Sequence, residues 1–281
     1  MGTNHKRIWS YLITTFLISW ISWGIIILSN RFGYMAAGSV LYDVFVAIGG
    51  AGTAVSIIIL KFKWKEFRNF RDMLKYVFWS EKLPFAFVVV ALAFLWRFAI
   101  VFLFSPHGNI VPLYSLFVSL PYAATFSGGF EELGWRGFLQ PELEKKLPFP
   151  IATLLTGIIW SCWHIPLFFI KGSSQSAINF MFFVFFIVVT SFTLAIIFRL
   201  TKNVFACALF HGWANVSFAI FAIQPSTSII IAFSAEILLT IVIYMILVRR
   251  KQIIADNPRS AEHKRREAKR KIPPSPPQKS I

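Results

Sequence analysis

The sequence is poor in charged residues, and acidic side chains are especially scarce. Charged residues make up 14% of the 281 residues, and Asp and Glu together number 12. A soluble globular domain carries about 25% charged residues, so this composition excludes an ordinary water-soluble fold. The chain has two cysteines, Cys162 and Cys207, and both lie inside apolar runs, which argues against a disulfide framework.

Long apolar runs take up most of the chain, which is 57% hydrophobic and contains 32 Phe. Each run is roughly 20 residues, the length that a helix needs to cross a hydrocarbon core of about 30 Å. The sequence therefore predicts an all-α fold, a polytopic membrane bundle of about eight transmembrane helices. The predicted spans are 8–29, 40–60, 84–104, 112–130, 150–170, 178–199, 204–223 and 229–248.

The formal charge of +16 is high enough to suggest a nucleic-acid partner, but the positions of the basic residues argue against one. Eleven of the 28 Lys and Arg follow residue 248, and seven lie in Lys61–Lys82. If the N-terminus is inside, the internal segments hold 24 of them and the external loops two, with Arg97 and Arg136 within or beside spans. Cytoplasmic loops of membrane proteins are enriched in Lys and Arg. We therefore expect a multi-pass cell-membrane protein with both termini cytoplasmic and no nucleic-acid partner.

Two basic segments are expected to bind anionic lipids. In Lys61–Lys82, aromatic and aliphatic residues recur at helical spacing opposite basic ones, which predicts an amphipathic helix on the inner leaflet. A plain basic loop is the alternative. Residues 249–281 are basic and then Pro-rich, which predicts a disordered cytoplasmic tail drawn to anionic headgroups. The expected organisation is a membrane domain over 1–248 followed by this tail.

Ionisable residues are costly inside a membrane helix, by about 2.5–3.5 kcal/mol on insertion scales, and point to function. Glu131 and Glu132 end the fourth predicted span, and Arg136 can pair with Glu132 as its i,i+4 neighbour. Glu131 is then free beside Gly128 and Gly129. An apolar site raises the pKa of a carboxylate into the range of a general base. The alternative is an interfacial charge cluster that ends a helix.

Two further polar clusters occur in spans five and seven. His164 lies in "WSCWHIPLFF", where a packing histidine is the alternative to a catalytic one. His211 and Asn215, four residues apart in "HGWAN", face one side of a helix and could donate two hydrogen bonds to one oxygen. An interhelical polar clasp is the alternative. Glu131 is expected to lie shallowest, so a broken or tilted helix around Gly128–Gly129 is needed to bring the clusters together.

Three other ionisable residues have no motif around them. Asp43, Arg97 and Glu236 lie in spans two, three and eight. We expect them to pair with one another or to reach the membrane interface, and we assign them no chemistry.

The order of the three motifs resembles the CPBP family of intramembrane proteases. This family includes CAAX prenyl endopeptidases of the ras-converting type and bacteriocin-processing or self-immunity relatives. The matching stretches are "EELGWR", "WSCWH" and "HGWAN", within about residues 112–223. The chain departs from the family at Trp160, where the family commonly has Phe.

The resemblance implies a role for each motif residue. Glu131 would be the catalytic carboxylate and would activate a water with His164. His211 and Asn215 would stabilise the oxyanion, and the site would be supported by Glu132 and Arg136. These groups suffice for amide hydrolysis without a covalent intermediate.

A cofactor is not required by this set, although members of the family are often labelled metalloproteases. The HExxH motif is absent. Zinc is the alternative, with Glu131, His164 and His211 as three ligands around an open position. We favour a metal-free site, because His211 would otherwise have to leave the oxyanion role.

The expected function is cleavage of a membrane-bound peptide or protein, either a prenylated CAAX-type substrate or a small bacteriocin-like peptide. A non-proteolytic immunity or scaffold protein of the same family is the alternative. A secondary transporter is a weaker alternative, since no inverted repeat relates residues 1–140 to 141–281. Aspartyl membrane proteases need two intramembrane Asp, and rhomboid-type sites need a Gly-x-Ser-Gly sequence, so neither fits this chain.

Overall fold

The computed structural model describes residues 2–79, 83–104, 119, 121, 124–125, 128–220 and 223–256, and every regular element in these ranges is a helix. The elements are α1 (Gly2–Arg31), α2 (Val40–Gly50), α3 (Gly52–Lys63), α4 (Phe70–Phe78), α5 (Leu83–Phe104), η1 (Gly129–Glu131), α7 (Glu132–Gly134), η2 (Trp135–Leu139), α8 (Gln140–Glu144), α9 (Phe149–Trp163), η3 (Ile165–Phe169), η4 (Gln175–Ala177), α10 (Phe180–Thr201), α11 (Val204–Ile220) and α12 (Thr227–Asp256).

Apolar helices coincide with seven of the eight predicted spans, and the all-α membrane architecture is confirmed. The bent pair α2 and α3 meets at 48° and counts as one candidate span, while α11 supplies a shorter apolar helix. The remaining predicted span, 112–130, lies mostly outside the described residues. The number of spans and the cytoplasmic side of both termini therefore stay predictions. Five helices are long and apolar enough to cross a membrane by themselves: His5–Arg31, Leu83–Phe104, Phe149–Phe169, Phe180–Thr201 and Thr227–Arg250.

The chain divides into two compact units, Met1–Leu238 and Leu239–Ile281, with the boundary inside α12. The first unit contains all three motifs. Helix α12 continues to Asp256, so it extends into the segment where we expect a disordered tail. Residues 257–281 lie outside the described part of the chain.

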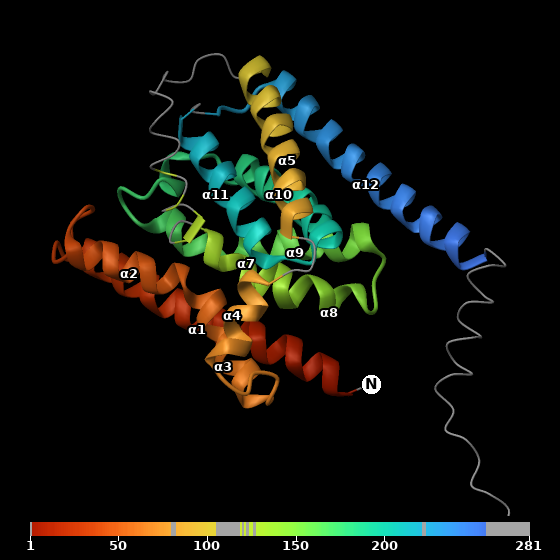
Figure 1. The fold of residues 1–281 in the computed structure, drawn as a ribbon. Coiled ribbons are helices and arrows are strands. Elements are labelled where there is room, and N and C mark those ends of the chain that lie inside the picture. Colours follow the sequence, from red (N-terminus) through yellow and green to blue (C-terminus); the bar gives the residue numbers. More distant parts are fainter. Residues whose placement is uncertain are drawn as a thin grey trace, which may run out of the picture. The chain divides into compact units, whose positions relative to one another are not determined.

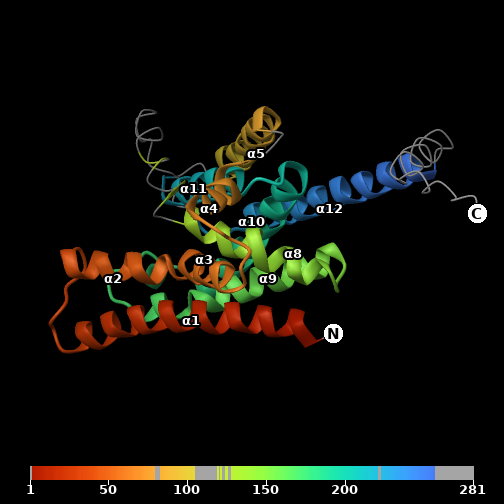
Figure 2. The ribbon, with the colours of Figure 1, turned by 60° about the horizontal axis from the view of Figure 1, so that its bottom comes forward.

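Helix α1 lies along α2 and α3 in both views of the fold (Figures 1 and 2). Small residues at the bend between α2 and α3 permit this close approach. A Cβ at Gly49 would lie 2.1 Å from Nε1 of Trp23, and one at Gly52 would lie 2.1 Å from Oγ of Ser19. The Ser19 hydroxyl also donates to the Gly49 carbonyl at 2.7 Å. The bend is thus fixed by α1, in the manner of small-residue packing between membrane helices.

Helices α9 and α11 carry the two histidine motifs, and both pack against α10. Most of α10 is buried, including Phe186, Ser191 and Phe192. Gly157 of α9 lets the α10 backbone come close, since a Cβ there would lie 3.2 Å from Cα of Val188. This central helix therefore sets the spacing between the motifs on α9 and α11.

Within the segment predicted to be amphipathic, Phe70–Phe78 forms the short helix α4, whereas its first residues, Lys61–Lys63, end α3. Phe70 and Leu74 are exposed, whereas the Tyr76 hydroxyl donates to the Leu133 carbonyl at 2.8 Å. Helix α4 is therefore tied directly to the segment that carries the paired glutamates. Its binding to anionic lipid stays a prediction, to be tested with vesicles that contain or lack such lipid.

Candidate active site

Glu131 and Glu132 lie in an irregular segment rather than on one continuous helix. The chain passes through the 3₁₀ turn η1 and the short helix α7 into a π-helical turn, η2. Gly128 just ahead has φ of 112°, in the left-handed region that glycine tolerates. A Cβ at Gly129 would lie 1.7 Å from the Ala124 carbonyl oxygen. The left-handed glycine and the tight contact therefore break the helix just ahead of both glutamates, as expected around Gly128–Gly129.

Glu131 is 7% exposed, and two indoles bind its carboxylate. Nε1 of Trp160 donates to Oε2 at 2.6 Å, and Nε1 of Trp135 donates to the same oxygen at 3.3 Å. Among the residues that the structure describes, Oε1 of Glu131 has no hydrogen-bond partner in the protein. One oxygen of this carboxylate is therefore anchored, and the other is available to a ligand or a water.

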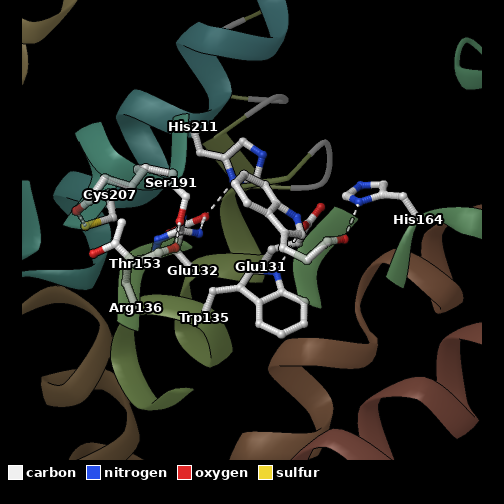
Figure 3. A network of polar contacts seen from close by, with 11 residues as sticks. Glu131, Glu132, Trp135, Arg136, Thr153, His164, Ser191, Cys207 and His211 are labelled. Atoms are coloured by element: carbon white, nitrogen blue, oxygen red, sulfur yellow. Dashed lines mark hydrogen bonds and ion pairs between the residues drawn. The ribbon is translucent and has the colours of Figure 1, made fainter. Parts of the chain in front are cut away.

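Glu132 is fully buried between a guanidinium and an imidazole (Figure 3). Nη1 of Arg136 donates to Oε1 of Glu132 at 3.1 Å, so the i,i+4 pair expected from the spacing forms. Nδ1 of His211 lies 2.8 Å from the same oxygen. An ionised carboxylate can only accept, so Nδ1 of His211 carries the hydrogen in this contact. Glu132 thereby orients the His211 ring and leaves Nε2 facing elsewhere.

His211 and Asn215 of α11 converge on Gly128. A Cβ built on Gly128 would lie 2.5 Å from Nε2 of His211 and 2.6 Å from Nδ2 of Asn215. Glycine is thus needed here both for its positive φ and for the space that these two nitrogens fill. The i,i+4 spacing of the two side chains brings their nitrogens to one point on the backbone, just ahead of Glu131.

His164 is the C-cap residue that follows α9, and it is 7% exposed. Its Nδ1 lies 3.0 Å from the Trp160 carbonyl, which can only accept, so Nδ1 is the donor and a neutral ring keeps its lone pair on Nε2. The ring packs against Trp163 and Phe183. No direct hydrogen bond joins His164 to Glu131 among the contacts of the described residues. The two are linked instead through Trp160, whose indole binds Glu131 and whose carbonyl binds His164.

A cavity of about 260 Å³ adjoins Glu131. Its wall combines the bend between α2 and α3 with the segment just ahead of Glu132, and its lining is mostly small or apolar. The break expected around Gly128–Gly129 is present, and the cavity lies beside it. The lining residues are Ala47, Ile48, Gly50, Ala51, Thr125, Gly128, Phe130 and Glu131.

The donor set does not fit a three-ligand metal site as the side chains are placed. Within the described ranges, no group of three His, Cys, Asp or Glu side chains is arranged to hold a metal ion. Nδ1 of His211 contacts Glu132 and Nδ1 of His164 contacts a backbone carbonyl, which leaves Nε2 of each ring open. The absence of three converging donors in the described part of the chain is the reason that we derive no step through zinc from Glu131, His164 and His211.

Sequence reasoning missed the two tryptophans that hold Glu131. Trp160 appears in the sequence as a departure from an aromatic motif position, and Trp135 follows Glu131 by four residues. A tryptophan four residues from a carboxylate was the available signal for Trp135.

The pairing of Arg97 with Glu236, expected as one of two options, is present, with contacts of 3.0 and 2.6 Å. Asp43 is exposed and has no part in this pair.

The comparisons with known proteins cover the same region. Residues 112–217 match the family model described as type II CAAX prenyl endopeptidase, Rce1-like. The curated protein CAAX prenyl protease 2 of Methanococcus maripaludis is 25% identical over 256 residues, with 78% of this chain and 87% of that protein covered. The family match contains all three motifs in their order, and the archaeal relative aligns over most of both chains. These two matches support the resemblance of the chain to the CPBP family of intramembrane proteases.

Proposed function

We propose that the chain is an intramembrane endopeptidase that hydrolyses a peptide bond of a membrane-associated substrate, with Glu131 as general base. The observation that carries this proposal is that Gly128 lies next to both the proposed base and the two proposed oxyanion donors. Gly128 lines the same cavity as Glu131, and the nitrogens of His211 and Asn215 lie against it. Glu131 thus lines the cavity and the two donors approach one of its lining residues, Gly128, so a base and two donors come close together, as attack by water on a carbonyl needs.

The proposed reaction begins when Glu131 takes a proton from water through Oε1. His164, whose Nε2 can accept a hydrogen bond, helps to orient that water. The water oxygen then bonds to the carbonyl carbon, and the carbonyl electron pair moves to its oxygen. His211 and Asn215 donate to this oxyanion. When the C–N bond breaks, the proton on Glu131 passes to the leaving nitrogen.

Glu132 and Arg136 act on the oxyanion donor His211 and do not contact the attacking water in this proposal. The carboxylate of Glu132 accepts from Nδ1 of His211 at 2.8 Å and so orients the ring with Nε2 toward Gly128. The proposed oxyanion role requires a hydrogen on Nε2 as well, as in an imidazolium, which donates from both nitrogens. Arg136, at 3.1 Å from Glu132, compensates the buried carboxylate.

A farnesylated peptide that ends in a CAAX sequence is the first probe, because the archaeal relative is named a CAAX prenyl protease. Full-length protein in proteoliposomes is expected to release a C-terminal fragment, detected by mass spectrometry.

Asn215→Ala should lower kcat by roughly 10²–10³-fold, since it removes one oxyanion donor. Asn179→Ala, which removes the N-cap of α10, should leave kcat nearly unchanged. Equal kcat for wild type and Asn215→Ala would contradict the oxyanion role. A failure to cut this probe or a bacteriocin-like peptide would favour the non-proteolytic scaffold alternative.

We propose further that the reaction needs no metal. Dialysis against 1,10-phenanthroline and EDTA is expected to leave the rate of peptide cleavage unchanged, because Glu131 activates the water directly. Metal analysis of the purified protein should find zinc well below one ion per chain. A loss of activity on chelation that added zinc restores would refute this and assign Glu131, His164 and His211 to metal binding.

A further inference from the structure

Trp160 contacts four residues of the proposed site at once. It is fully buried in α9, and its indole nitrogen donates to Oε2 of Glu131 at 2.6 Å. Its carbonyl accepts from Nδ1 of His164 at 3.0 Å. Its ring meets that of His211 edge to face at 4.9 Å, and Cζ of Arg136 lies 4.7 Å from its centroid. Trp160 thus joins the water-activating residues to the oxyanion donors.

The hydrogen bonds to Glu131 come from neutral indoles and not from a cation. Arg136, the nearest guanidinium in the motif, pairs with Glu132. The carboxylate of Glu131 is therefore oriented by Trp160 at 2.6 Å and more weakly by Trp135 at 3.3 Å. Hydrogen bonds to a charged acceptor are about twice as strong as neutral ones, and the shorter contact is the stronger.

Both indoles bind the same oxygen, and this determines which oxygen can act. Oε2 of Glu131 accepts two hydrogen bonds, whereas Glu131 also lines the cavity. A partial rotation of the carboxylate would break the 2.6 Å contact, whereas a half turn only exchanges two equivalent oxygens, so one oxygen stays anchored and the other stays open. A phenyl ring at position 160 would fill much of the same space but could donate nothing to Glu131.

Building on the proposed function, we propose that Trp160 is a positioning residue for the reaction. Its indole N–H fixes Oε2 of Glu131 so that Oε1 faces the cavity, and its carbonyl fixes the hydrogen of His164 on Nδ1.

Trp163 supplies a matched control one turn along the same helix. It is 1% exposed, and its Nε1 is buried without a hydrogen-bond partner among the described residues. Replacing it with Phe therefore changes a buried indole to a phenyl ring, as at position 160, but removes no hydrogen bond.

The kinetic test compares Trp160→Phe and Trp163→Phe in the full-length protein in proteoliposomes. The probe is the farnesylated CAAX peptide or, if that is not cut, the substrate identified from new protein termini in cells. Trp160→Phe is expected to lower kcat by about 10- to 100-fold, from the loss of a hydrogen bond to a charged group, with KM little changed. Trp163→Phe alters only packing against His164 and removes no hydrogen bond, so it should lower kcat much less than Trp160→Phe. Equal kcat values for the two variants, or an effect of Trp160→Phe confined to KM, would overturn the proposal.

A spectroscopic test is independent of activity. The ultraviolet resonance Raman difference between wild type and Trp160→Phe isolates the Trp160 indole and reports the strength of its N–H hydrogen bond. We expect the spectrum of a strongly hydrogen-bonded indole, and the signal should shift to that of a weakly bonded one in Glu131→Ala. The same signal in Glu131→Ala as in wild type would overturn the proposal. If wild type cuts no peptide, the proposed function fails, while this spectrum still decides whether Trp160 holds Glu131.

Discussion

Glu131→Gln is expected to lower kcat for peptide cleavage by roughly 10²–10⁴-fold, the range that general base catalysis contributes. Glutamine keeps the size of the side chain and can still accept from both indoles through its carbonyl oxygen. It cannot take a proton from water, so the loss should fall on kcat and not on binding of the peptide. Initial rates with purified protein in proteoliposomes measure both quantities.

Glu142→Gln is the control for this substitution. Glu142 is also 7% exposed, but it lies on α8, where it accepts from Lys145 at 2.5 Å. The same chemical change there should leave kcat near the wild-type value. Comparable kcat values for Glu131→Gln and wild type, with both proteins folded, would remove Glu131 from the chemistry.

Arg97→Met is expected to destabilise the first unit by about 3–5 kcal/mol, because it leaves the buried carboxylate of Glu236 without its cation. Both side chains are 1% exposed, and the guanidinium makes two contacts with the carboxylate, at 3.0 and 2.6 Å. Three phenyl rings surround the guanidinium, with centroids between 5.0 and 5.5 Å from Cζ. Little water can therefore replace the lost charge. Thermal unfolding in detergent measures the change.

The double variant Arg97→Met/Glu236→Leu separates loss of the pair from loss of volume. Replacing both charges with apolar side chains is often neutral, so the double variant should recover most of the stability lost by Arg97→Met. Arg199→Met is the comparison at a partly exposed pair with Glu144 and should cost less than about 1 kcal/mol. A double variant as unstable as Arg97→Met alone would contradict the view that an unpaired buried charge causes the loss.

The sequence predicts the membrane architecture because hydrocarbon thickness constrains the length of each apolar run. It also identifies the motif residues, since charged and polar side chains at membrane depth are costly and therefore conspicuous. The pairing of Glu132 with Arg136 follows from helical spacing alone and is present. These inferences depend on local rules and on composition.

The rest of the site depends on contacts between distant segments. The left-handed Gly128 and the π-helical turn after Gly134 are set by what packs against them, including the side chains of His211 and Asn215. The direction of the Trp160 indole, 29 residues from Glu131 along the chain, cannot be read from periodicity. Periodicity places a residue on a face of its helix, whereas a hydrogen bond needs a donor and an acceptor within about 3 Å.

The most direct test of the account compares new protein termini in membranes from cells that express wild type or Glu131→Gln at equal levels. If the chain is an intramembrane protease that depends on Glu131, some termini will appear with wild type and be absent with the variant. Their sequences will identify the substrate and show whether it is prenylated. Identical sets of termini from two folded proteins would contradict the account and favour a family member that binds peptides without cutting them.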